Sequence, residues 1–198
     1  MSLKGLRSET ALWGLLLCLS IAVQWTVPMI GDEAYFVSWG ANPALGYYDH
    51  PPLTGWISAV LWQVETWVGF FPHGVLHRLT ILLAGVATIF WLRGYFKSRH
   101  PELPYGALVI AFVALPASLI MFNVFMNDTL LTFFLLGFLI ATEKAFRSVR
   151  MSWWPVIFAG ISFGLALSIK YSAGIFFLGL VAYLLVSSAG RRFLFGRF

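Results

Sequence analysis

Long apolar runs separated by short polar segments organise this chain of 198 residues. Six runs approach the length of about 20 residues that a helix needs to cross a bilayer core. They cover 11–30, 75–92, 105–122, 129–142, 153–169 and 172–187. The fourth run is short, so we expect its helix to draw on further residues between 125 and 146. Only Lys170 and Tyr171 separate the last two runs, which predicts a tight helical hairpin.

The segment 53–71 has a different pattern, with apolar residues at helical spacing on one side only. These residues stand at 53, 56, 57, 60, 61, 64, 67, 68 and 71. The other side carries polar residues, among them Thr54, Ser58 and Glu65. The pattern predicts an amphipathic helix, which either forms a seventh span or lies flat in the membrane interface. In the flat arrangement we expect Glu65 to face water.

The positions of Lys and Arg favour the flat helix. If 53–71 lies in the interface and the N-terminus is cytoplasmic, eleven of the 13 Lys and Arg residues fall on the cytoplasmic side, as the positive-inside rule requires. These eleven are Lys4, Arg7, Arg93, Lys97, Arg99, Lys144, Arg147, Arg150, Arg191, Arg192 and Arg197. If 53–71 spans the membrane, only four fall there. We therefore predict a multi-pass protein of the plasma (inner) membrane with a cytoplasmic N-terminus and an outer, periplasmic loop over 31–74.

Composition agrees with a membrane protein. Hydrophobic residues make up 60% of the chain and charged residues 11%, and the mean hydropathy is +0.83. Soluble domains carry about 25% charged residues. The single cysteine, Cys18, excludes an intrachain disulfide and a cysteine-based metal cluster. No repeat or linker divides the chain, so we predict one transmembrane domain over 1–198, with membrane lipids and no nucleic acid among its partners.

The predicted topology collects acidic side chains on the outer side. Asp32 and Glu33 follow the first run directly and precede the aromatic segment AYFVSW, which would hold them near the lipid surface. A carboxylate in such a partly dehydrated position can act as a general base. The alternative is a solvated pair that marks the end of a helix.

A second polar group lies in the same loop, in the sequence YYDHPPL. Pro51 and Pro52 restrict the backbone, so Asp49 and His50 stand on a stiff turn before a helix N-terminus. Helix N-termini favour anions such as phosphate, although a capped turn without a ligand explains the pattern equally well. Asp32, Asp49 and His50 are also three candidate ligands for a divalent metal ion.

Lys170 is the only charged residue between 151 and 188. Ionisable groups inside such apolar stretches usually face a bundle interior or a polar cavity, whereas a lysine near the interface can also extend its ammonium group into water. Arg78 lies in a similar setting. Asp128 stands at the predicted outer end of the fourth span, where it is either a site residue or an ordinary helix N-cap.

The outer loop resembles a known family. The sequences GDEAYF and GYYDHPPL, followed by an amphipathic helix, are similar to the bacterial branch of the dolichyl-phosphate-mannose protein mannosyltransferases and to the lipid A aminoarabinose transferases. The segments MNDTLLTFF and GLALSIKYSA extend the resemblance. It implies an all-α polytopic membrane fold of the GT-C type, with about six transmembrane helices and interfacial helices in the first outer loop. Family members are longer, which implies a truncated chain or a partner chain that supplies the C-terminal part.

The resemblance also implies a function. The protein would be a hexosyl- or pentosyltransferase that moves a sugar from a polyprenyl-phosphate donor to a hydroxyl group of a lipid, glycan or protein. Asp32, with Glu33 beside it, would be the catalytic base, and Lys170 would stabilise the phosphate leaving group. The substrate-binding residues would be Tyr48, Asp49, His50, Arg78, Asp128 and Lys170. The sequence establishes no cofactor, and a divalent metal at Asp32, Asp49 and His50 is the one candidate.

Two other functions fit parts of the sequence. In a transporter or lipid flippase, Lys170, Arg78 and Asp128 would line a path across the bilayer. In a non-catalytic membrane subunit, the short chain would serve as a scaffold and Asp32 would have no chemical role.

Overall fold

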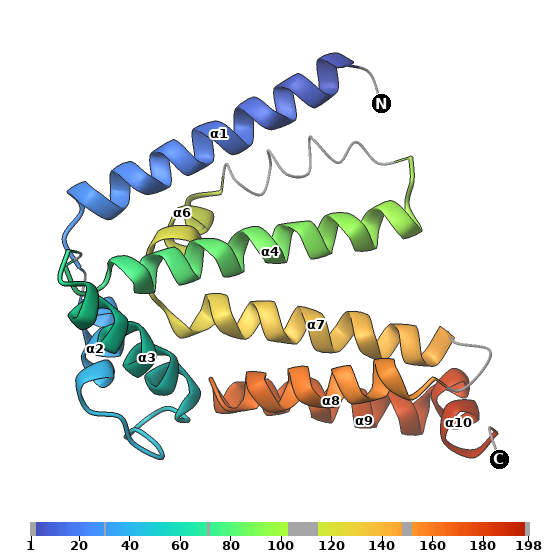
Figure 1. Ribbon diagram of the computed structural model, residues 1–198. Coiled ribbons are helices and arrows are strands. Elements are labelled where there is room, and N and C mark those ends of the chain that lie inside the picture. The colour runs from blue at the N-terminus through green and yellow to red at the C-terminus, as the bar shows by residue number, and fades with distance from the viewer. Residues whose placement is uncertain (1–2, 30, 71, 103–114, 148–151, 197–198) are drawn as a thin grey trace.

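The computed structural model describes residues 3–29, 31–70, 72–102, 115–147 and 152–196. Within these ranges every regular element is a helix (Figure 1). The α-helices are α1 (Leu3–Thr26), α2 (Gly31–Ser38), α3 (Leu53–Val68), α4 (Val75–Arg99), α6 (Pro116–Asn123), α7 (Asn127–Arg147), α8 (Trp153–Leu167), α9 (Gly174–Val186) and α10 (Ser188–Phe195). Two short 3₁₀ helices, η1 (Trp39–Ala41) and η2 (Tyr171–Ala173), lie between them.

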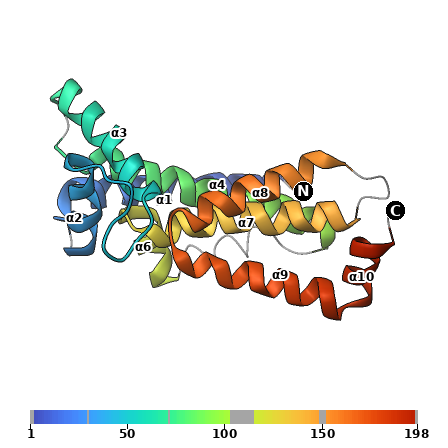
Figure 2. The same ribbon diagram turned by 90° about the horizontal axis from the view of Figure 1, so that it is seen from below.

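Helix α7 lies at the centre of the bundle, with α4 on one side and α8 on the other (Figure 1). The hydrophobic core follows α7 and includes Leu131, Leu135 and Phe138, together with buried residues of α8 and of the α2–η1 segment. The chain reverses direction between α8 and α9, as Figure 2 shows, so the predicted hairpin around Lys170 is confirmed. Helix α9 reaches α8 through stacked aromatic rings, with Phe163 and Phe177 centroids 5.2 Å apart.

The number of membrane-spanning helices is only partly confirmed. Among the described residues, α4 and α7 are long and apolar enough to cross a membrane, and 13–26 with 31–41 makes a third span if this bent pair is counted as one. Helices α8 and α9 are apolar but shorter, at 15 and 13 residues. Residues 105–114 of the predicted span 105–122 lie outside the described residues, and the described part of this span belongs largely to α6. The six predicted spans are therefore not confirmed as a set.

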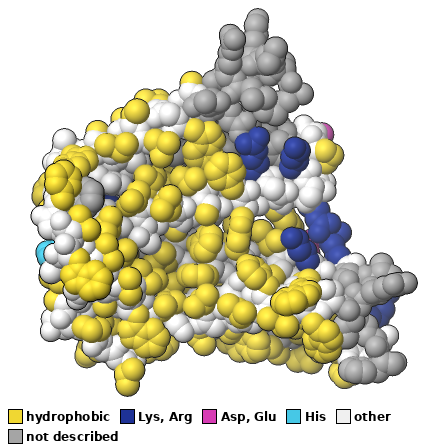
Figure 3. Space-filling model, in the orientation of Figure 1, with side chains coloured by type: hydrophobic (Ala, Val, Ile, Leu, Met, Phe, Trp, Pro, Cys, Tyr) yellow, Lys and Arg dark blue, Asp and Glu magenta, His cyan; other side chains and the backbone are white. Residues whose placement is uncertain are grey.

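Basic side chains gather at one end of the bundle, as Figure 3 shows. The last turns of α4 and α7 carry Lys97, Arg99, Lys144 and Arg147, and α10 lies at the same end (Figure 1). Helices α2 and α3 lie at the opposite end. The segregation of charge predicted from the sequence is thus present along the bundle, while its orientation in a membrane stays a prediction.

Helix α3 lies obliquely to α4 and α7, beside α2 (Figures 1 and 2). It ends at Gly69, whose positive φ of 64° is a backbone conformation that glycine adopts at low cost. Its polar residues Thr54, Ser58 and Glu65 are buried, while Trp67 and Val60 on the apolar side are exposed. The expectation that Glu65 faces water is therefore wrong. The polar side of α3 packs against the rest of the protein, and its apolar side lies on the surface. An apolar surface of this kind is suited to contact with lipid.

Candidate functional site

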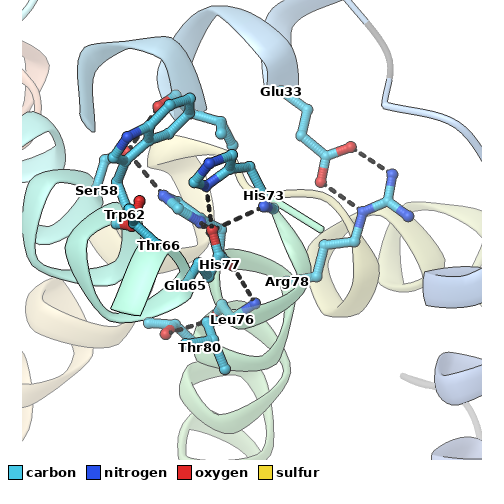
Figure 4. Close-up of polar contacts among 12 residues, drawn as sticks. Glu33, Ser58, Trp62, Glu65, Thr66, His73, Leu76, His77, Arg78 and Thr80 are labelled. Atoms are coloured by element: carbon cyan, nitrogen blue, oxygen red, sulfur yellow. Dashed lines mark hydrogen bonds and ion pairs between the residues drawn. The ribbon is translucent and has the colours of Figure 1, made fainter. Parts of the chain in front are cut away.

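Arg78 of α4 and Glu33 of α2 form a buried ion pair (Figure 4). Arg78 Nε and Nη2 donate to the two oxygens of Glu33 at 2.7 Å and 2.6 Å. Nη1 donates to the carbonyl oxygens of Gln24 and Val27, at 3.3 Å and 2.8 Å. Carbonyl groups at a helix C-terminus have no intrahelical partner, so Arg78 also caps the end of α1.

The same pair reaches a fourth part of the chain. The backbone amide of Phe125, between α6 and α7, donates to Glu33 Oε1 at 3.2 Å. Glu33 and Arg78 therefore hold α1, α2, α4 and the α6–α7 connection together, and both Glu33 oxygens have partners. We assign this pair a positioning role. The catalytic role predicted for Glu33 and the substrate-binding role predicted for Arg78 stay predictions.

Glu65 forms a second buried centre at the α3–α4 turn (Figure 4). Its carboxylate accepts hydrogen bonds from the backbone amides of Gly74 at 3.0 Å and Leu76 at 2.6 Å, and it lies near Nδ1 of His73 and His77. Burial raises the pKa of Glu65, but the hydrogen bonds from His77 and the two amides outweigh burial, so its pKa lies below the ordinary glutamate value.

A pH dependence of stability follows from this pKa. Because the pKa of Glu65 is lowered on folding, its contribution to stability is complete above the ordinary glutamate pKa and is lost as the pH falls through the lowered value. Glu65→Gln should therefore destabilise the protein by about 1–3 kcal/mol near neutral pH, and by less at about pH 3. Thermal unfolding in detergent across this range measures the difference. The exposed Glu102 provides the control, since Glu102→Gln should have no effect. A difference that stays constant with pH would contradict a role for the Glu65 charge.

Glu65, His77 and Ser58 make a chain of carboxylate, imidazole and hydroxyl. His77 Nε2 lies 2.8 Å from Ser58 Oγ, and this hydroxyl donates to the carbonyl oxygen of Val37 at 3.1 Å. All three side chains are buried, which leaves Ser58 no approach for a substrate. These hydrogen-bonded side chains join α3 and α4 to α2, and their role is structural.

The predicted turn at Asp49 and His50 forms the exposed rim at this end. His50 Nδ1 lies 2.9 Å from Asp49 Oδ1, and the Tyr35 hydroxyl donates to the same oxygen at 3.2 Å. Contact with His50 lowers the pKa of Asp49, so this carboxylate is charged at neutral pH. The Phe36 and Trp39 rings border His50. Tyr48, next in the chain to Asp49, is fully exposed.

Tyr47 anchors the rim to α3. Its ring stacks on Trp39 with centroids 3.9 Å apart, and it covers the face of α3 at Gly55. A Cβ atom at Gly55 would collide with the Tyr47 ring. Gly55→Ala should therefore displace Tyr47, cost about 1–3 kcal/mol of stability and loosen the rim. Thermal unfolding and limited proteolysis measure both effects. Gly46→Ala is the matched control, because nothing lies within 4 Å of its Cβ position. Equal behaviour of the two variants would refute the anchor.

Lys170 and Asp128 meet at the same end. Lys170 Nζ lies 2.8 Å from Asp128 Oδ1, which joins the α8–η2 turn to the first turn of α7, and both side chains remain partly exposed. The backbone amide of Leu53 donates to the carbonyl oxygen of Ser168 at 2.9 Å. This bond ties the start of α3, three residues after His50, to the turn that carries Lys170. The structure thus brings together two polar groups that stand far apart in the sequence.

The other predicted site residues do not form such contacts with one another in the described parts of the chain. Asp32 is exposed on α2, beside Glu33, and the structure gives it no side-chain bond to Asp49 or His50. Among the described residues no three His, Cys, Asp or Glu side chains lie close enough to hold a metal ion, so we derive no step through a metal at Asp32, Asp49 and His50. Asn127, which is not among the predicted site residues, begins α7 with a buried amide that has no hydrogen-bond partner in the described parts.

Comparison with known proteins gives one family and one relative. The profile of the dolichyl-phosphate-mannose-protein mannosyltransferases matches residues 49–197. The chain is 27% identical over 190 residues to the lipid A galacturonosyltransferase RgtD of Rhizobium johnstonii, with 89% of this chain and 38% of that protein covered. It therefore spans well under half of the length of this curated relative. No solved structure matches.

Proposed function

Because the chain belongs to the dolichyl-phosphate-mannose-protein mannosyltransferase family, we propose that it carries part of the site of a membrane glycosyltransferase. The donor would be a sugar attached to a polyprenyl phosphate, and the acceptor a hydroxyl group of a lipid, glycan or protein. The site would lie at the bundle end formed by α2, the Asp49–His50 rim and the Lys170–Asp128 pair, facing the outer side of the plasma (inner) membrane.

One observation carries this proposal. The Leu53–Ser168 hydrogen bond joins the start of α3, just after Asp49 and His50, to the turn just before Lys170. Helix α2, which carries Asp32, lies at the same end of the bundle (Figure 1). A cation and several carboxylates at one edge of an apolar bundle suit a reaction between a lipid-linked phosphate and a polar acceptor. The Arg78–Glu33 pair does not compete for this role, because its groups are buried and already paired.

The proposed reaction is a direct displacement at the anomeric carbon of the sugar. Asp32 takes the proton of the acceptor hydroxyl, whose oxygen forms the new bond to the anomeric carbon. The bond between this carbon and the phosphate oxygen breaks, and its electron pair stays on the polyprenyl phosphate. The Lys170 ammonium stabilises the departing phosphate. In this step the phosphate replaces Asp128 as the partner of Lys170. Displacement from the opposite side inverts the configuration of the sugar carbon.

The Lys170 cation provides the test. Native mass spectrometry of the protein purified in mild detergent should reveal a bound polyprenyl phosphate, and Lys170→Ala should lower its occupancy about tenfold, since a hydrogen bond to a charged group is lost. Lys97→Ala at the basic end removes the same charge and should leave binding unchanged. Because the Lys170–Asp128 pair is partly exposed, Lys170→Ala should hardly alter thermal stability.

Two results would count against the proposal. If the wild-type protein retains no polyprenyl phosphate, or if Lys170→Ala and Lys97→Ala bind it equally well, the donor does not bind at this end. A scaffold role would then explain the chain better. Movement of an intact lipid across vesicles without sugar transfer would instead support the transporter alternative.

A further inference from the structure

A pocket lies at the other end of the bundle, where α4 and α8 diverge across α7. Its volume is about 750 Å³, within the range of about 300–1,000 Å³ that small-molecule sites occupy. Phe90, Trp91 and Phe158 supply much of its apolar lining. Trp91 packs against Gly137 and stacks on Phe133 with centroids 4.9 Å apart, so this wall is held in place.

The mouth of this pocket is cationic. Arg99 and Lys144 line it together with Glu143. Glu143 pairs with Arg99 Nη2 at 2.9 Å and with Arg147 Nε at 2.7 Å, so two arginines share one carboxylate. Lys144 has no partner among the described residues, and it adds a further positive charge. The electrostatic surroundings of the mouth therefore favour an anion.

One buried donor is left over at the mouth. Arg99 is fixed by Glu143 on one side and by the Tyr95 ring, 5.8 Å from its guanidinium carbon, on the other. Its Nε is nevertheless buried and without a hydrogen-bond partner in the described parts of the chain. No acceptor among the described residues offsets the charge at this atom, so Arg99 adds to the positive potential of the mouth.

We propose that this pocket binds an anionic glycerophospholipid, with an acyl chain along the aromatic wall and the phosphate at Lys144 and the exposed part of the Arg99 side chain. The pocket opens on the basic end of an apolar bundle, where phospholipid is the abundant molecule that combines a long apolar chain with a negative head. It lies at the end opposite the Lys170–Asp128 pair, so the proposal does not depend on the proposed glycosyl transfer.

Two variants test the binding of the lipid phosphate and of the acyl chain separately, and each has a matched control. Lys144→Gln removes the free cation, and Lys97→Gln removes a neighbouring charge that does not line the pocket. Gly94→Leu fills the pocket from α4, where a Cβ atom meets nothing within 4 Å, and Gly179→Leu makes the same change in open space on α9. Neither glycine substitution needs a neighbour to move at Cβ, so all four proteins should fold.

Native mass spectrometry with added phosphatidylglycerol and phosphatidylcholine tests the proposal. We expect the wild-type protein to prefer phosphatidylglycerol. Lys144→Gln and Gly94→Leu should each weaken its binding about tenfold, while Lys97→Gln and Gly179→Leu should match the wild type. No preference for the anionic lipid, equal loss in Lys144→Gln and Lys97→Gln, or unchanged binding in Gly94→Leu would overturn the proposal. Displacement of phosphatidylglycerol from this pocket by polyprenyl phosphate would overturn it as well.

Discussion

Arg78→Gln is expected to destabilise the protein by about 3–5 kcal/mol, because it leaves the buried Glu33 carboxylate without its cation. The loss should be large compared with other single substitutions, since the guanidinium also caps α1 through the Gln24 and Val27 carbonyls. Thermal or chemical unfolding in a fixed detergent measures it. Glu33→Gln should cost a similar amount for the converse reason, that it leaves a buried guanidinium short of charge.

Two controls distinguish a buried pair from a general loss of charge. Arg147→Gln removes an arginine that pairs with Glu143 but is largely exposed, and should change stability by less than about 1 kcal/mol. The double variant Glu33→Met with Arg78→Met should be more stable than Arg78→Gln alone, because no unpaired charge remains. If the double variant loses the sum of the losses of Glu33→Met alone and Arg78→Met alone, the two side chains do not act as a pair.

Asp32→Asn is expected to lower sugar transfer by about 100- to 10,000-fold, the usual contribution of a general base, while donor binding and thermal stability remain unchanged. Asp32 is exposed, and its side chain has no bond to the described residues that Asn would break, so folding should not be affected. Transfer of radiolabelled sugar from a polyprenyl-phosphate donor to membrane acceptors measures the rate, and native mass spectrometry measures donor binding in the same preparation.

Measuring donor binding and transfer rate separately distinguishes a catalytic role of Asp32 from a binding role and from a scaffold role of the protein. A scaffold role predicts that Asp32→Asn leaves both unchanged, and normal transfer by this variant would exclude Asp32 as the base. Loss of donor binding together with transfer would instead place Asp32 among the binding residues. Glu102→Gln, at the opposite end of the bundle, provides the matched control and should leave transfer unchanged.

The hydrophobic pattern predicts those features of the fold that depend on one helix alone, namely its length and its polar and apolar sides. Helices α4 and α7 and the turn at Lys170 follow from apolar length and one isolated charge. The pattern also found the two sides of α3, but it could not tell which medium each side faces. The polar side of α3 contacts protein and its apolar side is exposed, so the position expected for Glu65 was wrong.

The sequence pattern does not predict which side chains from distant helices form pairs. Arg78 was identified as an unusual charge, yet its partner Glu33 is 45 positions away and was interpreted separately as a catalytic group. Such a pairing depends on how α2 and α4 pack, which no local pattern contains. The Lys170–Asp128 pair was predicted only as two residues at one membrane face, and the structure supplies their contact.

The Glu33–Arg78 pair has a consequence for the biosynthesis of this protein. Glu33 emerges from the ribosome before Arg78, which follows 45 residues later, and before Phe125, which follows 92 residues later. At about 5–20 residues per second, the carboxylate waits several seconds for its cation and longer for its amide donor. Until then Glu33 cannot be buried at low cost. Helices α1 and α2 can therefore complete their contacts with α4 only after Arg78 has been made, and the bond to the α6–α7 connection forms last.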